Sequence, residues 1–126
     1  MSSRMQVLVV EDDETIRDLV HLALSDEGYD VMAAPHGKAA LDLLQNTQPD
    51  VILLDMCMPV MDGWDFCRAY GMTPGPHAPV IILTAALQPS FLASDIKADG
   101  YLSKPFDLDD LIGLVRKYRN RKLPLA

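Results

Sequence analysis

Residues 51–63 read VILLDMCMPVMDG, which joins a run of four apolar residues to one carboxylate, Asp55, and then to a turn that ends in glycine. A short continuous apolar run bounded by turn residues indicates a strand buried on both faces, as in a parallel sheet. Asp55 then lies at the carboxyl end of a buried strand, where a carboxylate is a candidate functional residue.

Other expected strands also end in polar residues. Glu11 and Asp12 follow one apolar run, Thr84 follows another, and Lys104 follows a shorter apolar pair. The carboxyl ends of the strands in an open parallel sheet line one edge, and ligands bind in the crevice outside it. We therefore expect these four side chains and Asp55 to meet in one crevice.

The expected crevice carries three carboxylates, one hydroxyl and one amine. Clustered carboxylates repel one another unless a cation lies between them, and oxygen ligands of this kind suit a hard ion such as Mg²⁺. The sequence therefore predicts a site for phosphoryl chemistry.

Strand-like runs alternate with segments of helical periodicity, which predicts βαβ units and an α/β fold. The expected strands are 6–10, 30–34, 50–54, 79–83 and 100–103. The expected helices are 14–27, 38–46, 63–70 and 108–120, with a short helix after Pro89. The core face expected for the first helix carries Ile16, Leu19, Val20, Ala23 and Leu24.

Length and charge narrow the function. A chain of 126 residues suits one domain. The net charge of −7 argues against direct nucleic acid binding. Cys57 and Cys67 lack the spacing of a metal site or a disulfide framework, and no apolar run is long enough to cross a membrane. We expect a soluble, cytoplasmic protein with reduced thiols.

Five spaced elements together resemble the receiver domain, the phosphoaccepting module of two-component response regulators. They are Glu11-Asp12, Asp55 with Pro59 and Asp62-Gly63, Thr84-Ala85, Asp99-Gly100-Tyr101 and Lys104-Pro105-Phe106. The resemblance covers residues 5–121 and makes 1–126 a single receiver domain, with 122–126 as a tail or a linker stub. It implies a flavodoxin-like (βα)5 doubly wound sandwich with strand order 2-1-3-4-5.

The resemblance also assigns roles to the acidic residues. Asp55 is implied to be the phosphoacceptor. Asp12, Asp55 and the backbone carbonyl of Cys57 are implied ligands of Mg²⁺ or Mn²⁺, with Glu11 acting through a water molecule. Without the resemblance, Asp55 reads equally well as a strand-end turn cap, and Glu11 and Asp12 as acids favoured near a helix N-terminus.

Lys104 and Thr84 are implied to contact the phosphoryl oxygens, with the Lys104-Pro105 bond held cis to aim the lysine inward. Thr84 and Tyr101 are implied to form the switch, in which the hydroxyl moves toward the phosphate and the aromatic ring follows. Tyr101 also reads as a half-exposed strand residue with its hydroxyl in water.

The resemblance implies that two side chains control the attack of water on the acyl phosphate, and here neither offers a strong hydrogen-bonding group. They are Cys57, two residues after the acceptor, and Ala86, two residues after Thr84. We expect slow self-dephosphorylation, although Cys57 also reads as a small packing residue. The three histidines, His21, His36 and His77, lack ligand spacing and are expected at the surface, and Trp64 is expected to pack.

The implied function is a switch phosphorylated by a sensor histidine kinase or a phosphotransfer protein and read by an output domain or a partner protein. Such a protein is not an enzyme beyond its own phosphorylation and dephosphorylation, and the resemblance leaves open a phosphorylation-dependent homodimer. A receiver-like interaction module that works without phosphorylation is the main alternative. A haloacid dehalogenase phosphatase would need an Asp where Cys57 stands, and a flavodoxin-like cofactor binder would need a phosphate loop after Val10.

Overall fold

A computed structural model of the chain describes residues 4–58 and 60–122. Strands and helices alternate throughout, in the order predicted. The elements are β1 Gln6–Val10, α1 Glu14–Asp26, β2 Asp30–Ala34, α2 Gly37–Leu44, β3 Val51–Asp55, α3 Gly63–Gly71, β4 Val80–Thr84, α4 Pro89–Asp95, β5 Gly100–Ser103 and α5 Leu108–Lys122. Pro59 and the residues 123–126 of the expected tail lie outside the described residues.

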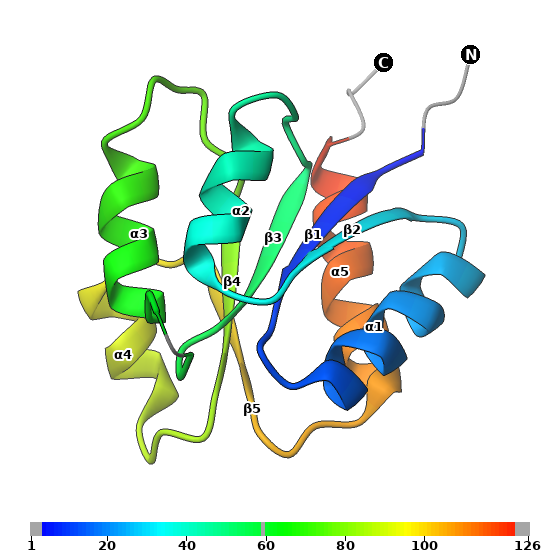
Figure 1. The fold of residues 1–126 in the computed structure, drawn as a ribbon. Coiled ribbons are helices and arrows are strands. Elements are labelled where there is room, and N and C mark those ends of the chain that lie inside the picture. The colour runs from blue at the N-terminus through cyan, green and yellow to red at the C-terminus, as the bar shows by residue number, and fades with distance from the viewer. Residues whose placement is uncertain (1–3, 59, 123–126) are drawn as a thin grey trace.

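The five strands form one sheet in the order β2-β1-β3-β4-β5, and all four pairings are parallel. This arrangement confirms the predicted fold and strand order. The chain builds the sheet outward in opposite directions from β1 and β3, so the switch point that favours ligand binding lies between these two strands. Their carboxyl ends lie at the lower edge of the sheet in Figure 1.

Helices cover both faces of the sheet. Helices α1 and α5 lie on one side, and α2, α3 and α4 lie on the other (Figure 1). Each side encloses its own apolar cluster, one centred on Leu24, Leu53 and Leu111 and the other on Ile52 and Phe66. All residues of β3 and β4 are buried, as expected for central strands covered on both faces.

Two strands, β3 and β4, each begin and end one residue later than predicted. β3 ends at Asp55 and β4 ends at Thr84, so both polar residues belong to the strands that they were expected to follow. Asp55 pairs with Leu83 and Thr84 pairs with Ser103 in the sheet register. The two functional candidates are therefore fixed by the sheet.

Two side chains do not lie where the sequence placed them. Leu19 is 50% exposed, because the buried face of α1 uses Val20 and Leu24 instead. Trp64 is 40% exposed in the first turn of α3 and does not pack in the core. His36 lies partly exposed, as expected for a surface residue, and its Nδ1 also accepts a hydrogen bond of 3.1 Å from the N–H of Ala39 that caps α2.

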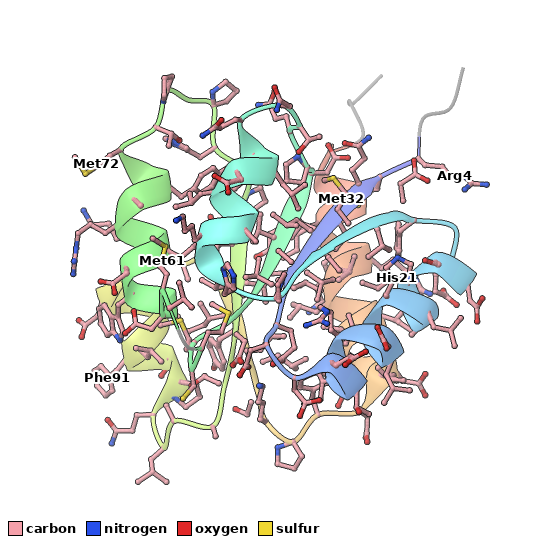
Figure 2. The ribbon with its side chains drawn as sticks, viewed as in Figure 1. Arg4, His21, Met32, Met61, Met72 and Phe91 are labelled. Atoms are coloured by element: carbon pink, nitrogen blue, oxygen red, sulfur yellow. The ribbon has the colours of Figure 1, made fainter. Side chains whose placement is uncertain are left out.

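The loop between β3 and α3 is held close to the sheet by a glycine. A Cβ added to Gly63 would lie 2.8 Å from the Cα of Met56, so no larger residue fits without movement of the backbone. Asp62 caps α3 by accepting a hydrogen bond from the N–H of Asp65. Met61, labelled in Figure 2 beside α2, closely approaches Gly37 at the start of that helix.

Within residues 4–58 and 60–122, no helix has the length and apolar character needed to cross a membrane.

Candidate functional site

The candidate phosphoacceptor is buried at the carboxyl end of the central strand β3. Asp55 is 3% exposed, and its Oδ1 accepts a hydrogen bond of 3.3 Å from the N–H of Cys57. A buried carboxylate requires partners that compensate for the loss of water. Lys104, which follows β5, supplies one such partner.

Glu11 lies at the end of β1, beside Asp55. Its side chain is 1% exposed, and its backbone N–H donates to the carbonyl of Ala34, which continues the pairing of β1 with β2. One carboxylate oxygen, Oε2, accepts a hydrogen bond of 3.2 Å from the N–H of Asp13. Glu11 is therefore a fixed part of the site.

The ammonium group of Lys104 joins these two acids. Nζ lies 3.0 Å from Oδ1 of Asp55 and 3.2 Å from Oε1 of Glu11. The backbone N–H of Lys104 donates to the carbonyl of Thr84, and the Lys104-Pro105 bond is cis. The structure thus confirms the cis bond and the inward direction of Lys104.

Burial and charge oppose each other at Lys104. Burial acts to lower the pKa of its ammonium group, but the nearby carboxylates of Asp55 and Glu11 outweigh it, and the pKa is raised. Lys104 is therefore positively charged at neutral pH and offers a fixed donor to an anion.

The pKa of Glu11 is raised to about 7, first by burial and then by its contact with Asp55. The N–H of Asp13 and the charge of Lys104 act in the opposite direction but do not cancel the effect. The raised pKa therefore reflects burial first, and the smaller contribution from repulsion by Asp55 is the one that a bound cation would relieve.

A metal ion fits the acidic residues of this site. Glu11, Asp12 and Asp55 each offer a carboxylate oxygen, and these atoms lie within 4.8 Å of one another. Asp12 is exposed, so the cluster opens to solvent on one side. Hard oxygen donors, one of them accessible, suit Mg²⁺, which binds few carboxylates and keeps several waters.

Thr84 completes the rim of the site. Its side chain is 6% exposed, and its Oγ1 accepts a hydrogen bond of 3.0 Å from the N–H of Ala86. Accepting this hydrogen bond uses only a lone pair of the oxygen. The hydroxyl hydrogen of Thr84 therefore remains available to donate.

A family model described as the response regulator receiver domain matches residues 7–116, which include all of the five strands except Gln6 at the start of β1. The chain belongs to the response regulator receiver domain family.

Relatives of known sequence support this membership. The chain is 38% identical over 122 residues to the response regulator MprA of Mycobacterium sp. (strain KMS), a match that covers 95% of this chain and 53% of that protein. A similar protein of Mycobacterium avium (strain 104) is also 38% identical over 122 residues. The chain thus spans about half the length of the curated relatives it matches.

Solved structures share the fold. The chemotaxis response regulator CheY4 of Vibrio cholerae superimposes with a TM-score of 0.85 at 34% identity, covering 92% of this chain and 99% of that chain. The receiver domain of the Francisella response regulator 1452 gives a TM-score of 0.83 at 32% identity, covering 95% of this chain and 100% of that one.

The receiver brings together most of the residues predicted from sequence. Lys104 contacts both Asp55 and Glu11. Asp12 lies with these two acids in the acidic cluster. Tyr101 lies apart from them on β5, where its side chain is 43% exposed. The switch role of Tyr101 remains a prediction.

Sequence reasoning missed one residue of the receiver site. Arg17 reaches back from α1, and its Nη1 donates a hydrogen bond of 2.9 Å to the carbonyl oxygen of Glu11. Nothing in the local sequence distinguishes Arg17 from an ordinary solvent-facing helix residue. Only the path of the turn between β1 and α1 reveals the contact.

Proposed function

We propose that this receiver is a phosphorylation switch in which Asp55 accepts a phosphoryl group from a phosphohistidine on a sensor kinase or a phosphotransfer protein. The observation that carries the proposal is the cluster of Asp55, Glu11 and Asp12 with Lys104 held 3.0 Å from Asp55. Membership of the receiver family supports the nature of the donor.

The transfer exchanges one bond to phosphorus for another. A carboxylate oxygen of Asp55 attacks the phosphorus in line, forming a P–O bond as the P–N bond to the histidine breaks. The imidazole nitrogen keeps the electron pair of that bond. The product is an acyl phosphate on Asp55, and no redox partner is needed.

The charge of the transferring group must be neutralised where it develops. Lys104 already carries a positive charge beside Asp55, and its ammonium can turn its donors to a phosphoryl oxygen. Thr84 offers its hydroxyl hydrogen to another oxygen, because its own oxygen is held by Ala86.

Asp12, Asp55 and the backbone carbonyl of Cys57 would hold Mg²⁺ or Mn²⁺, with Glu11 acting through a bound water. When bound, the ion supplies positive charge to the phosphoryl oxygens and relieves the repulsion among the acids. The exposed side of the cluster at Asp12 leaves room for it.

The output is a change of surface and not the turnover of a substrate. Thr84 joins the site to β5, because it pairs with Ser103 two residues beyond the exposed Tyr101. A hydroxyl drawn toward the phosphoryl group would favour a different position of the Tyr101 ring, and a partner protein or an output domain would read the difference.

Intact mass spectrometry after incubation with acetyl phosphate and Mg²⁺ tests the proposal. We expect the gain of one phosphoryl group, lost in Asp55→Asn and in the presence of EDTA. No gain by a folded wild-type protein would favour the alternative, an interaction module that works without phosphorylation.

A further inference from the structure

The turn between β1 and α1 presents two of the three acids of the site. Glu11 is tied to β2 through its N–H, whereas Asp12 follows it out of the sheet. The direction of both carboxylates therefore depends on what fixes the backbone between the end of β1 and the start of α1.

The carbonyl groups of this turn lack backbone partners. Within residues 4–58 and 60–122, no backbone N–H donates to the carbonyl oxygen of Glu11 or Asp12. In a regular helix the N–H of Ile16 would bond to Asp12, but it donates to the side chain of Asp13 instead, at 3.0 Å. A side chain can supply the donor that these carbonyls lack.

Arg17 supplies this side chain. Its Nη1 lies 2.9 Å from the carbonyl oxygen of Glu11 and 3.5 Å from that of Asp12. Its backbone N–H donates to the carbonyl oxygen of Asp13, so the backbone and the side chain of Arg17 both bind the same turn. Arg17 as a residue is partly buried. Hydrogen bonds from a charged donor are roughly twice as strong as neutral ones.

We propose that Arg17 is a positioning residue for the metal site: it holds the turn in the conformation that carries the carboxylates of Glu11 and Asp12 to Asp55. The inference rests on the proposed function, because it assigns a purpose to the same acidic cluster. It goes beyond that function because Arg17 contacts the backbone of the turn and none of the reacting atoms.

A positioning role and a purely electrostatic role of Arg17 predict opposite effects of its removal on the affinity for Mg²⁺. A fixed positive charge near a cation site repels the cation, so a purely electrostatic Arg17 would weaken metal binding and its removal would strengthen it. A positioning Arg17 strengthens metal binding, because loss of outer contacts lets the ligands move.

Calorimetric titration with Mg²⁺ separates these possibilities. We expect Arg17→Ala to raise the Kd for Mg²⁺ about tenfold, which lies within the range for loss of an outer contact at a metal site. Arg17→Lys, which keeps one donor group, should fall between Arg17→Ala and wild type. Arg116→Ala is the matched control, since Arg116 contacts Glu27 beyond the opposite end of α1, and it should leave the affinity unchanged.

Hydrogen exchange supplies a measurement without metal. The N–H of Asp13 donates to Oε2 of Glu11, so it reports the conformation of the turn directly. In metal-free Arg17→Ala this N–H should exchange faster than in wild type, while Arg116→Ala should not change it.

An Arg17→Ala variant that binds Mg²⁺ as tightly as wild type, or more tightly, would overturn the inference while leaving the proposed function intact. If Arg17→Ala does not fold, the Kd of Arg17→Lys for Mg²⁺ is compared with that of wild type instead. A higher Kd supports the inference, and an equal or lower Kd overturns it. A wild-type protein that binds no Mg²⁺ would overturn the proposed metal site and the inference with it.

Discussion

Nζ of Lys104 lies 3.0 Å from Oδ1 of Asp55, although 49 positions separate the two residues in the chain. The sheet creates this contact, because Asp55 ends β3 and Lys104 follows β5, with β4 between them. The proposed phosphoacceptor is thereby paired with a cation that could bind the phosphoryl oxygens.

The Lys104 contact predicts that metal binding and phosphoryl transfer respond oppositely to one substitution. Lys104→Met removes a positive charge beside the acids, so the Kd for Mg²⁺ should fall about tenfold. The same change removes a donor to the developing charge and should slow phosphorylation by acetyl phosphate about 100-fold. Calorimetry and timed intact mass measure the two effects.

Lys38→Met is the control for this experiment, because Lys38 is exposed on α2. It makes the same change of charge and should alter neither quantity. A Lys104→Met protein that is phosphorylated as fast as wild type would show that the Lys104 ammonium does not assist the transfer.

Gly63 should tolerate no side chain. A Cβ there would lie 2.8 Å from the Cα of Met56, and the backbone cannot yield as a flexible side chain can. We expect Gly63→Ala to lower the free energy of unfolding by about 2 kcal/mol, as overpacking does. Gly113→Ala, in α5 with nothing within 4 Å, should have no such cost. Urea unfolding of both variants and of wild type measures the free energies of unfolding. A Gly63→Ala protein as stable as wild type would contradict the prediction.

The acyl phosphate should be long-lived, because neither Cys57 nor Ala86 offers a strong hydrogen-bonding group to the attacking water. Cys57→Asn, which adds an amide beside Asp55, should shorten the half-life about tenfold or more. Cys57→Ala should not shorten it. Loss of the phosphoryl mass with time measures both, and a shorter half-life in Cys57→Ala would sink the explanation.

The two cysteines should react at different rates with iodoacetamide. Burial raises the pKa of Cys67 to about 11, with a smaller contribution from Asp99, whereas Cys57 is exposed. Only the thiolate reacts, so a thiol with a raised pKa reacts slowly below that pKa and faster as pH rises toward it. At pH 8 peptide mapping should find Cys57 modified first. Equal labelling at pH 8 would contradict the burial of Cys67.

The sequence predicted most of the site because apolar runs and the polar residues at their ends are local signals. The runs before Glu11, Asp55 and Thr84 identified the strands, and parallel pairing then required their ends to meet. The strand order was implied by the family resemblance and not by the runs themselves.

Other features depend on contacts that no local pattern reveals. Asp55 belongs to β3 because it pairs with Leu83 from a separate strand. Leu19 fits a helical apolar stripe, yet the sheet contacts the neighbouring face of α1. Arg17 looks like a solvent-facing residue until the turn brings the Glu11 carbonyl within 2.9 Å of it.

Chemical trapping tests directly whether Asp55 is the phosphoacceptor. Borohydride reduces an acyl phosphate on aspartate to homoserine, which peptide mapping locates in the chain. After incubation with acetyl phosphate and Mg²⁺, we expect homoserine at position 55 and at no other acid. An unmodified Asp55 in folded protein, or reduction at a different carboxylate, would contradict it.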